Sequence, residues 1–168
     1  MPVYSLPTLS AGTPIFVDAN ILVYGINGRS IQCHDFLERC SQEKVVGVCL
    51  YEVVNEATHR FMLGEAINKK LIAKESAASL RQKYHLIPTL TDYWQRTERI
   101  FKLNLLIFSS DESLIRAAQI ERQSFGLLTN DSMIVACMRQ QGISAIATCD
   151  SDFEQVSGIS VFRPDDLP

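Results

Sequence analysis

Short apolar runs alternate along this chain with longer segments of helical periodicity. Five short runs have the length of buried strands: 15–17, 45–49, 105–108, 144–147 and 159–162. Six longer segments carry apolar side chains at helical spacing: 31–40, 50–63, 65–83, 92–104, 111–123 and 131–141. Strands that alternate with helices are typical of a parallel sheet with right-handed crossovers. The pattern therefore predicts the α/β class.

Capping residues mark several of the expected helix ends. Ser30 and Ser110 each stand just before a helical segment, so we expect them to be N-caps. Gly126 and Gly142 are expected to stop the helices before them, and Gly64 to end or interrupt another.

The length and composition are those of one soluble globular domain. The chain has 168 residues, of which 46% are hydrophobic and 21% charged. We expect a tail over residues 1–13, either disordered or wrapped around the body, and a single domain over 14–168. Neither a bilayer-spanning apolar segment nor a secretory signal is evident, which predicts a cytoplasmic protein without a membrane partner.

The cysteines do not indicate a metal site or a disulfide framework. They are odd in number, scattered and without CxxC spacing: Cys33, Cys40, Cys49, Cys137 and Cys149. We interpret them as reduced, mostly buried thiols.

Charge is unevenly distributed. The formal net charge is −3, unlike the basic surface expected for contacts with phosphate groups. Six basic residues nevertheless fall in one middle stretch: Arg60, Lys69, Lys70, Lys74, Arg81 and Lys83. Taken singly they indicate a solvated helical face, whereas as a group they could line a groove for a polyanion.

Four acidic residues occupy positions that the predicted fold would bring together. Asp18 directly follows one predicted strand, and Asp150 comes at the end of another after Thr148 and Cys149, at the sheet edge where ligands bind in open α/β folds. Glu56 lies on the helix after the second strand, and Asp131 begins another helix. Clustered carboxylates repel one another unless a divalent cation lies between them. The sequence therefore predicts a metal-dependent hydrolase.

Two of these residues have a simpler structural interpretation. Asp18 could cap a helix that begins at Ala19. Asp131 could be a charge favoured by the dipole at the start of its helix.

Two other positions have a competitor nearby. Glu52 is four residues before Glu56, so both can lie on one helix face, and we favour Glu56 as the ligand. Asp152 competes with Asp150, which we favour; Asp152 is then an auxiliary or solvated carboxylate.

The chemistry expected of such a site follows from its ligands. Hydrolysis of a phosphodiester needs a deprotonated water and relief of charge on the phosphoryl oxygens, which Mg²⁺ or Mn²⁺ supplies. Hard oxygen ligands favour those ions over zinc. Two ions would lie about 3.5–4 Å apart, with Asp18 as the expected shared ligand. No side-chain nucleophile is required.

Four short motifs occur in order along the chain: V-D-A-N-I-L-V-Y (17–24), V-V-N-E (53–56), L-L-T-N-D-S-M-I-V-A-C-M (127–138) and A-T-C-D-S-D-F (147–153). Together they resemble the motifs of the PIN-domain nucleases, which include the VapC toxins of bacterial toxin–antitoxin pairs. The resemblance covers the chain from about residue 14 to residue 164. Ala19 departs from it, because threonine or serine is commoner at that position.

The resemblance implies a three-layer α/β/α domain that cleaves RNA with Mg²⁺ or Mn²⁺. It assigns the metal-binding carboxylates to Asp18, Glu56, Asp131 and Asp150, with Asp152 as a possible additional ligand, and it makes Asn20 a supporting residue. It also implies a homodimer and, for a toxin, an antitoxin partner.

Two other enzyme classes fit less well. A phosphatase of the haloacid-dehalogenase type needs a second aspartate two residues after the first, where this chain has Asn20. A phosphate-binding loop needs a glycine-rich run after a strand, and the sequence has none. The remaining alternative is a catalytically inactive PIN-fold module with a binding or structural role.

Overall fold

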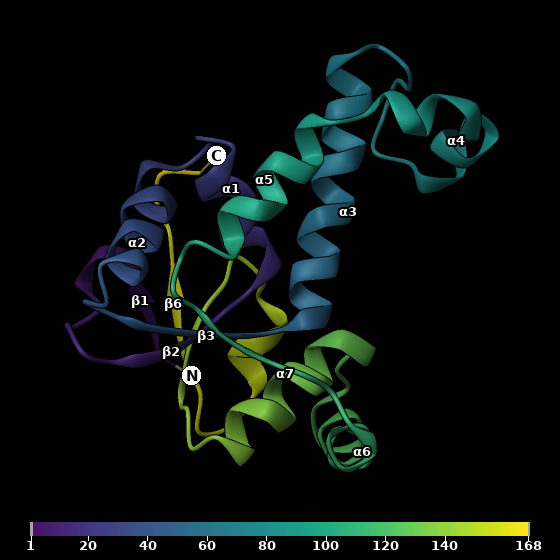
Figure 1. The fold of residues 1–168 in the computed structure, drawn as a ribbon. Coiled ribbons are helices and arrows are strands. Elements are labelled where there is room, and N and C mark those ends of the chain that lie inside the picture. The colour runs from purple at the N-terminus through teal and green to yellow at the C-terminus, as the bar shows by residue number, and fades with distance from the viewer. Residues whose placement is uncertain (1, 168) are drawn as a thin grey trace.

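A six-stranded parallel sheet forms the centre of the structure, a computed structural model that describes residues 2–167 (Figure 1). The strand order is β1-β6-β5-β2-β3-β4, and every neighbouring pair is parallel. The strands are β1 (Val3–Ser5), β2 (Pro14–Val17), β3 (Val46–Leu50), β4 (Leu106–Phe108), β5 (Ala145–Ala147) and β6 (Ser160–Arg163). The predicted α/β class with a parallel central sheet is confirmed.

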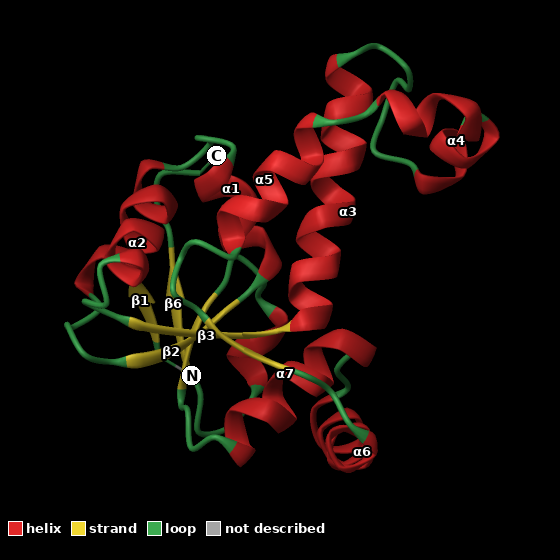
Figure 2. Cartoon of the chain, viewed as in Figure 1, coloured by secondary structure: helices red, strands yellow, loops and turns green. Residues whose placement is uncertain are grey.

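Helices cover both faces of this sheet (Figure 2). They are α1 (Ala19–Ile26), α2 (Ile31–Ser41), α3 (Tyr51–Asn68), α4 (Ala77–Gln82), α5 (Asp92–Ile100), α6 (Glu112–Phe125) and α7 (Thr129–Gln140). The chain steps from β2 to β3 to β4 in one direction and then returns to β5 on the other side of β2. Right-handed crossovers in opposite directions place α1, α2, α3 and α5 on one face and α6 and α7 on the other. The three-layer α/β/α arrangement is therefore confirmed.

The far end of α3 projects beyond the sheet together with α4 (Figure 1). A small separate apolar cluster stabilises this projection, and it consists of Leu63, Ala66, Ile72, Leu80 and Leu90. The main core lies between the sheet and the two helical layers and includes the fully buried Phe16, Phe36 and Ile146.

Two predictions for this region are wrong. Gly64 does not end α3, which continues to Asn68. A single glycine costs a helix only about 1 kcal/mol relative to alanine, and packing of Leu63 and Ala66 outweighs that cost. The helix predicted over 65–83 is also not formed. The chain leaves α3 through Lys70, whose φ is +58°, and only the short α4 follows.

Residues 3–9, which belong to the segment expected as a tail, pack against the rest of the domain. Val3 pairs with Val161 in the sheet, while Leu6 and Leu9 are buried. The sheet thus extends beyond the domain start expected at residue 14, and Met1 lies outside the described residues. None of the helices in the described part of the chain has both the length and the apolarity to cross a membrane.

Several helix ends match the expected capping. Ser30 Oγ accepts a hydrogen bond from Cys33 N at 2.9 Å, and Gly126 ends α6 with a φ of +66°. The cap of α6 is Asp111 rather than the expected Ser110, because the Asp111 carboxylate reaches Leu114 N at 2.8 Å.

Candidate metal-dependent active site

Asp18 and Asp150 lie where the strand order changes direction. Strand β2 leads directly into Asp18, and the adjacent β5 leads through Thr148 and Cys149 to Asp150. In open α/β sheets a ligand binds at this point, outside the carboxyl ends of the strands. Asp18 is also the N-cap of α1, because its Oδ1 accepts a hydrogen bond from Ala19 N at 2.6 Å. Asp18 therefore caps α1 and at the same time lies at the point where a metal ligand is expected.

A hydrogen-bond network fixes the orientation of Asp18. Its Oδ2 accepts hydrogen bonds from Asn20 Nδ2 and from Thr148 Oγ1, the latter at 2.6 Å. Thr148 Oγ1 in turn accepts from Asp150 N at 2.9 Å, and Asn20 Oδ1 accepts from Cys149 N at 2.9 Å. Because the network joins the ends of β2 and β5, the two aspartates are held in a fixed relation to each other.

Glu56 and Asp131 reach the same place from helices. A cavity of about 410 Å³, here called the carboxylate cavity, is lined by Asp18, Asn20, Tyr24, Glu56, Arg60, Asp131, Cys149, Asp150 and Ser151. Glu56 comes from the second turn of α3 and Asp131 from the first turn of α7. The structure therefore brings the four favoured carboxylates into one cavity.

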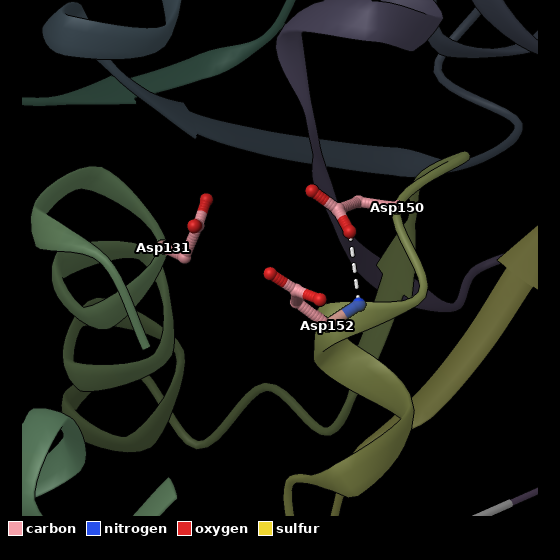
Figure 3. A group of neighbouring side chains, drawn as sticks. All are labelled: Asp131, Asp150 and Asp152. Carbon is pink, nitrogen blue, oxygen red and sulfur yellow. Dashed lines mark hydrogen bonds between the residues drawn. The ribbon is translucent and has the colours of Figure 1, made fainter. Parts of the chain in front are cut away.

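Asp152 lies close to two of these carboxylates, those of Asp131 and Asp150. One carboxylate oxygen each of Asp131, Asp150 and Asp152 lies within 4.8 Å of the other two. Figure 3 shows Asp131 on its helix facing the other two aspartates, and Asp152 N donates a hydrogen bond of 2.8 Å to Asp150 Oδ1. Asp152 thus lies beside Asp150 rather than replacing it.

Glu52 lies outside the carboxylate cavity. It is one helical turn before Glu56, and its charge raises the pKa of the Cys137 thiol, which places it near α7. Its Oε2 is buried, and no hydrogen-bond partner for it exists within residues 2–167. Of the two glutamates, Glu56 lines the carboxylate cavity and Glu52 does not.

The carboxylates strongly perturb one another. The pKa of Asp18 is raised from 3.8 to about 6. Burial is the largest cause, hydrogen bonds from Thr148 and Ala19 act in the opposite direction, and the charges of Glu56 and Asp131 add to the increase. Burial is likewise the largest cause that raises the pKa of Asp131 to about 6, followed by the charges of Asp150, Asp152 and Glu56. A pocket that resists ionisation in this way is typical of a functional site.

The donor set fits a hard divalent cation. All the clustered acidic groups offer carboxylate oxygens, and no histidine lines the cavity. Cys149 does line it, but burial and the charge of Asp18 raise the pKa of its thiol to about 11. A protonated thiol is a poor ligand and a poor nucleophile. Oxygen ligands of this kind suit Mg²⁺ or Mn²⁺.

Two residues of the site, Thr148 and Tyr24, were not assigned a role from the sequence, and Arg60 was considered only as one of six basic residues that could line a groove for a polyanion. Thr148 was only a strand-end residue in the pattern, although a fully buried hydroxyl needs a partner. Tyr24 and Arg60 stand four residues after Asn20 and Glu56 on their helices, and this spacing places them on the same helix faces. That spacing was the available signal for both.

The sequence is similar to a known protein family and to a named relative. A family model described as "PIN domain" matches residues 15–159. Ribonuclease VapC6 of Methanocaldococcus jannaschii is 24% identical in an alignment of 157 residues that covers 89% of this chain and 96% of the relative.

Solved structures share the fold. The chain superimposes with a TM-score of 0.57 and 16% identity on a structure of VapBC2 from Rickettsia felis bound to a DNA fragment from its promoter, covering 91% of this chain and 100% of that one. A toxin–antitoxin complex from Klebsiella pneumoniae gives a TM-score of 0.54 at 19% identity, with coverages of 86% and 94%. Since the family model spans most of the sequence, and the motifs predicted the same family, the chain belongs to the PIN-domain family.

Proposed function

We propose that the protein is a metal-dependent ribonuclease that hydrolyses RNA phosphodiester bonds. The observation that carries this proposal is the convergence of Asp18, Glu56, Asp131 and Asp150 on one cavity at the carboxyl end of the sheet. Membership of the PIN-domain family and the similarity to a named ribonuclease support a nuclease.

Asp18, Glu56, Asp131 and Asp150 would hold Mg²⁺ or Mn²⁺, with Asp152 as an additional ligand beside Asp150. A bound divalent cation lowers the pKa of water and offsets charge on the phosphoryl oxygens. The protein's part is to fix the carboxylates, which Thr148 and Asn20 do for Asp18. The raised pKa of the Cys149 thiol argues against this side chain as the nucleophile, so water is the nucleophile that we propose.

The biological role we propose is that of the toxin in a toxin–antitoxin pair, with an antitoxin protein as partner. Support comes from the relative named VapC6 and from two structural neighbours described as VapBC2 and as a toxin–antitoxin complex. Homodimer formation and a cytoplasmic location, both expected from the sequence, belong to the same proposal.

The test is cleavage of a mixed RNA pool by the purified protein with Mg²⁺, with Mn²⁺ and with EDTA. The wild type is compared with Asp131→Asn, which removes one charge from the cavity at nearly constant volume. A matched control is Asp35→Asn, since Asp35 is exposed on α2, away from the site. We expect cleavage that requires metal, disappears in Asp131→Asn and persists in Asp35→Asn. A folded wild-type protein that cuts RNA under none of these conditions would favour the inactive binding module.

A further inference from the structure

A second cavity adjoins the carboxylate cavity and has the opposite charge. Its volume is about 470 Å³, and Arg60 lines both cavities. Its charged lining consists of three guanidinium groups, those of Arg29, Arg60 and Arg96, against the single carboxylate of Glu75. This second space is here called the arginine cavity.

The two cavities follow each other along the same pair of helices. On α3, Glu56 lines the carboxylate cavity and Arg60, four residues later, lines both cavities. On α1, Asn20 lines the carboxylate cavity and Val23, three residues later, lines the arginine cavity. One helical turn rises about 5.4 Å. Successive phosphates of one strand of duplex DNA are roughly 3.4 Å apart along the axis, and an extended single strand spaces them more widely. The arginine cavity therefore begins within one or two nucleotides of a phosphate bound at the carboxylates.

The three arginines keep their charge available. Within residues 2–167 none of them forms an ion pair with a carboxylate. The Arg29 and Arg60 guanidinium groups lie 5.6 Å and 5.5 Å from the centroid of the Tyr24 ring, and Arg96 donates a hydrogen bond to Asn27 Oδ1. These contacts orient the side chains without neutralising them.

Guanidinium groups held in this way favour a phosphate ligand. Arginine presents donors in a planar fork that matches two phosphate oxygens at once. The carboxylate cavity by itself repels a polyanion, so a substrate strand needs positive charge close to the reacting phosphate. Glu75 is exposed, and its charge offsets only one of the three arginines.

We propose that the arginine cavity binds a backbone phosphate of the RNA strand next to the phosphate that is cleaved. Arg29, Arg60 and Arg96 are then positioning residues for the substrate, and this assignment rests on the proposed ribonuclease function. An acidic segment of a protein partner has matching charge, but RNA is favoured because Arg60 also lines the carboxylate cavity.

The test measures RNA binding separately from cleavage. A short fluorescent single-stranded RNA of mixed sequence is titrated with the Asp131→Asn protein and followed by anisotropy, with and without Arg29→Gln or Arg60→Gln. Each glutamine is expected to raise the Kd about tenfold. The slope of log K against log salt should decrease in magnitude by about 0.7 for each phosphate that the variant no longer neutralises.

Arg116→Gln is the matched control. Arg116 is exposed on α6 and paired with Glu112, so we expect no change in either quantity. Arg60→Lys retains the positive charge and should keep most of the salt dependence of RNA binding. Thermal unfolding of each variant verifies that it is folded.

Cleavage kinetics in the otherwise wild-type protein complete the test. Arg29→Gln should raise KM with little change in kcat, as expected for a positioning residue distant from the reacting atoms. An unchanged Kd and salt slope in folded Arg29→Gln and Arg60→Gln proteins would overturn the assignment and leave an acidic protein segment as the occupant. A wild type that binds RNA through these arginines without cutting it would contradict the ribonuclease proposal but support the arginine cavity.

Discussion

The Thr148 hydroxyl donates a hydrogen bond of 2.6 Å to Asp18 Oδ2, from the end of β5 to the end of β2. The same hydroxyl oxygen accepts the backbone N–H of Asp150 at 2.9 Å. One buried hydroxyl therefore couples the aspartates that follow two neighbouring strands. Partners of this kind orient metal ligands and tune their affinity.

Removal of this hydroxyl should weaken the site without unfolding the protein. Thr148→Val keeps the shape of the side chain but leaves Asp150 N without its partner. We expect the affinity for Mn²⁺ and the cleavage rate to fall by roughly 10–100-fold, measured by calorimetry and by RNA cleavage. Thr148→Ser restores the donor and should behave nearly as the wild type. Equal loss in both variants would show that packing, and not the hydroxyl, is responsible.

Asp131→Asn should stabilise the protein when metal is absent. Burial, together with the charges of Asp150, Asp152 and Glu56, raises the Asp131 pKa from 3.8 to about 6. Because the folded-state pKa is the higher one, the wild type loses stability as pH rises between these values, and the loss is complete above about 6. The variant should exceed the wild type by about 1–3 kcal/mol at neutral pH and should match it below about pH 4.

Urea unfolding in EDTA at both pH values measures this difference. Added Mn²⁺ should make the wild type more stable than Asp131→Asn, because a ligand stabilises the folded protein that binds it and the variant lacks one metal-binding carboxylate. A gain in stability that is independent of pH would exclude carboxylate repulsion as its cause.

Glu56 and Glu52 form a matched pair for locating the α3 ligand. Glu56 lines the carboxylate cavity, whereas Glu52 is one turn earlier and outside it. Glu56→Gln should reduce cleavage at least on the order of a hundredfold, and Glu52→Gln should leave it within a few-fold of wild type. Single-turnover cleavage with saturating Mn²⁺ measures both. The reverse order would place Glu52 at the metal.

Glu65 should matter for stability and not for catalysis. It is 2% exposed and accepts hydrogen bonds from Thr91 N at 2.9 Å and from Tyr93 N at 2.8 Å, at the start of α5. Lys69 Nζ also lies 2.6 Å from its carboxylate. The N-cap residue of α5 supplies no side-chain hydrogen bond, so Glu65→Ala leaves the partly buried N–H groups of Thr91 and Tyr93 without their partner. We expect a loss of roughly 2–4 kcal/mol in the free energy of unfolding.

This loss should depend on pH. Burial raises the pKa of Glu65, but hydrogen bonds from Lys69, Tyr93 and Thr91 outweigh that effect and hold it below its usual value. A folded-state pKa below the unfolded-state pKa stabilises the fold at pH values above the unfolded-state pKa. The difference in unfolding free energy between Glu65→Ala and the wild type should therefore shrink in acid. Glu112→Ala removes an exposed ion pair on α6 and should cost no more than about 1 kcal/mol. A comparable loss in both variants would contradict the capping role.

Much of the fold could be predicted because its signals are local. Residues 15–17 and 144–147 are mostly apolar runs of strand length, and an aspartate comes one residue after the first run and three residues after the second, so both the strands and their place at the site could be recognised. The course of the chain after Gly64 could not be predicted, because packing in the projection between α3 and α4 decides where α3 ends.

The candidate site likewise has residues that local patterns could predict and residues that they could not. Asp18, Glu56, Asp131 and Asp150 occur in recognisable motifs, and the structure brings them together. Thr148 and the arginine cavity depend on contacts between distant segments: Thr148 and Asp18 are 130 residues apart, and Arg96 meets Asn27 across 69 residues. No local pattern marks such contacts. The sequence grouped Arg60 with basic residues further along the chain, whereas the arginines that share its cavity are Arg29 and Arg96.

The central claim is that the clustered carboxylates bind the divalent cation that RNA cleavage requires. Its most direct test is one titration with Mn²⁺ near neutral pH that follows both bound metal, by electron paramagnetic resonance, and cleavage of a labelled RNA. We predict that binding and cleavage saturate together in the wild type and in Asp35→Asn, and that both are lost in Asp131→Asn. Cleavage that persists in EDTA, or in a folded Asp131→Asn protein that no longer binds Mn²⁺, would contradict the claim.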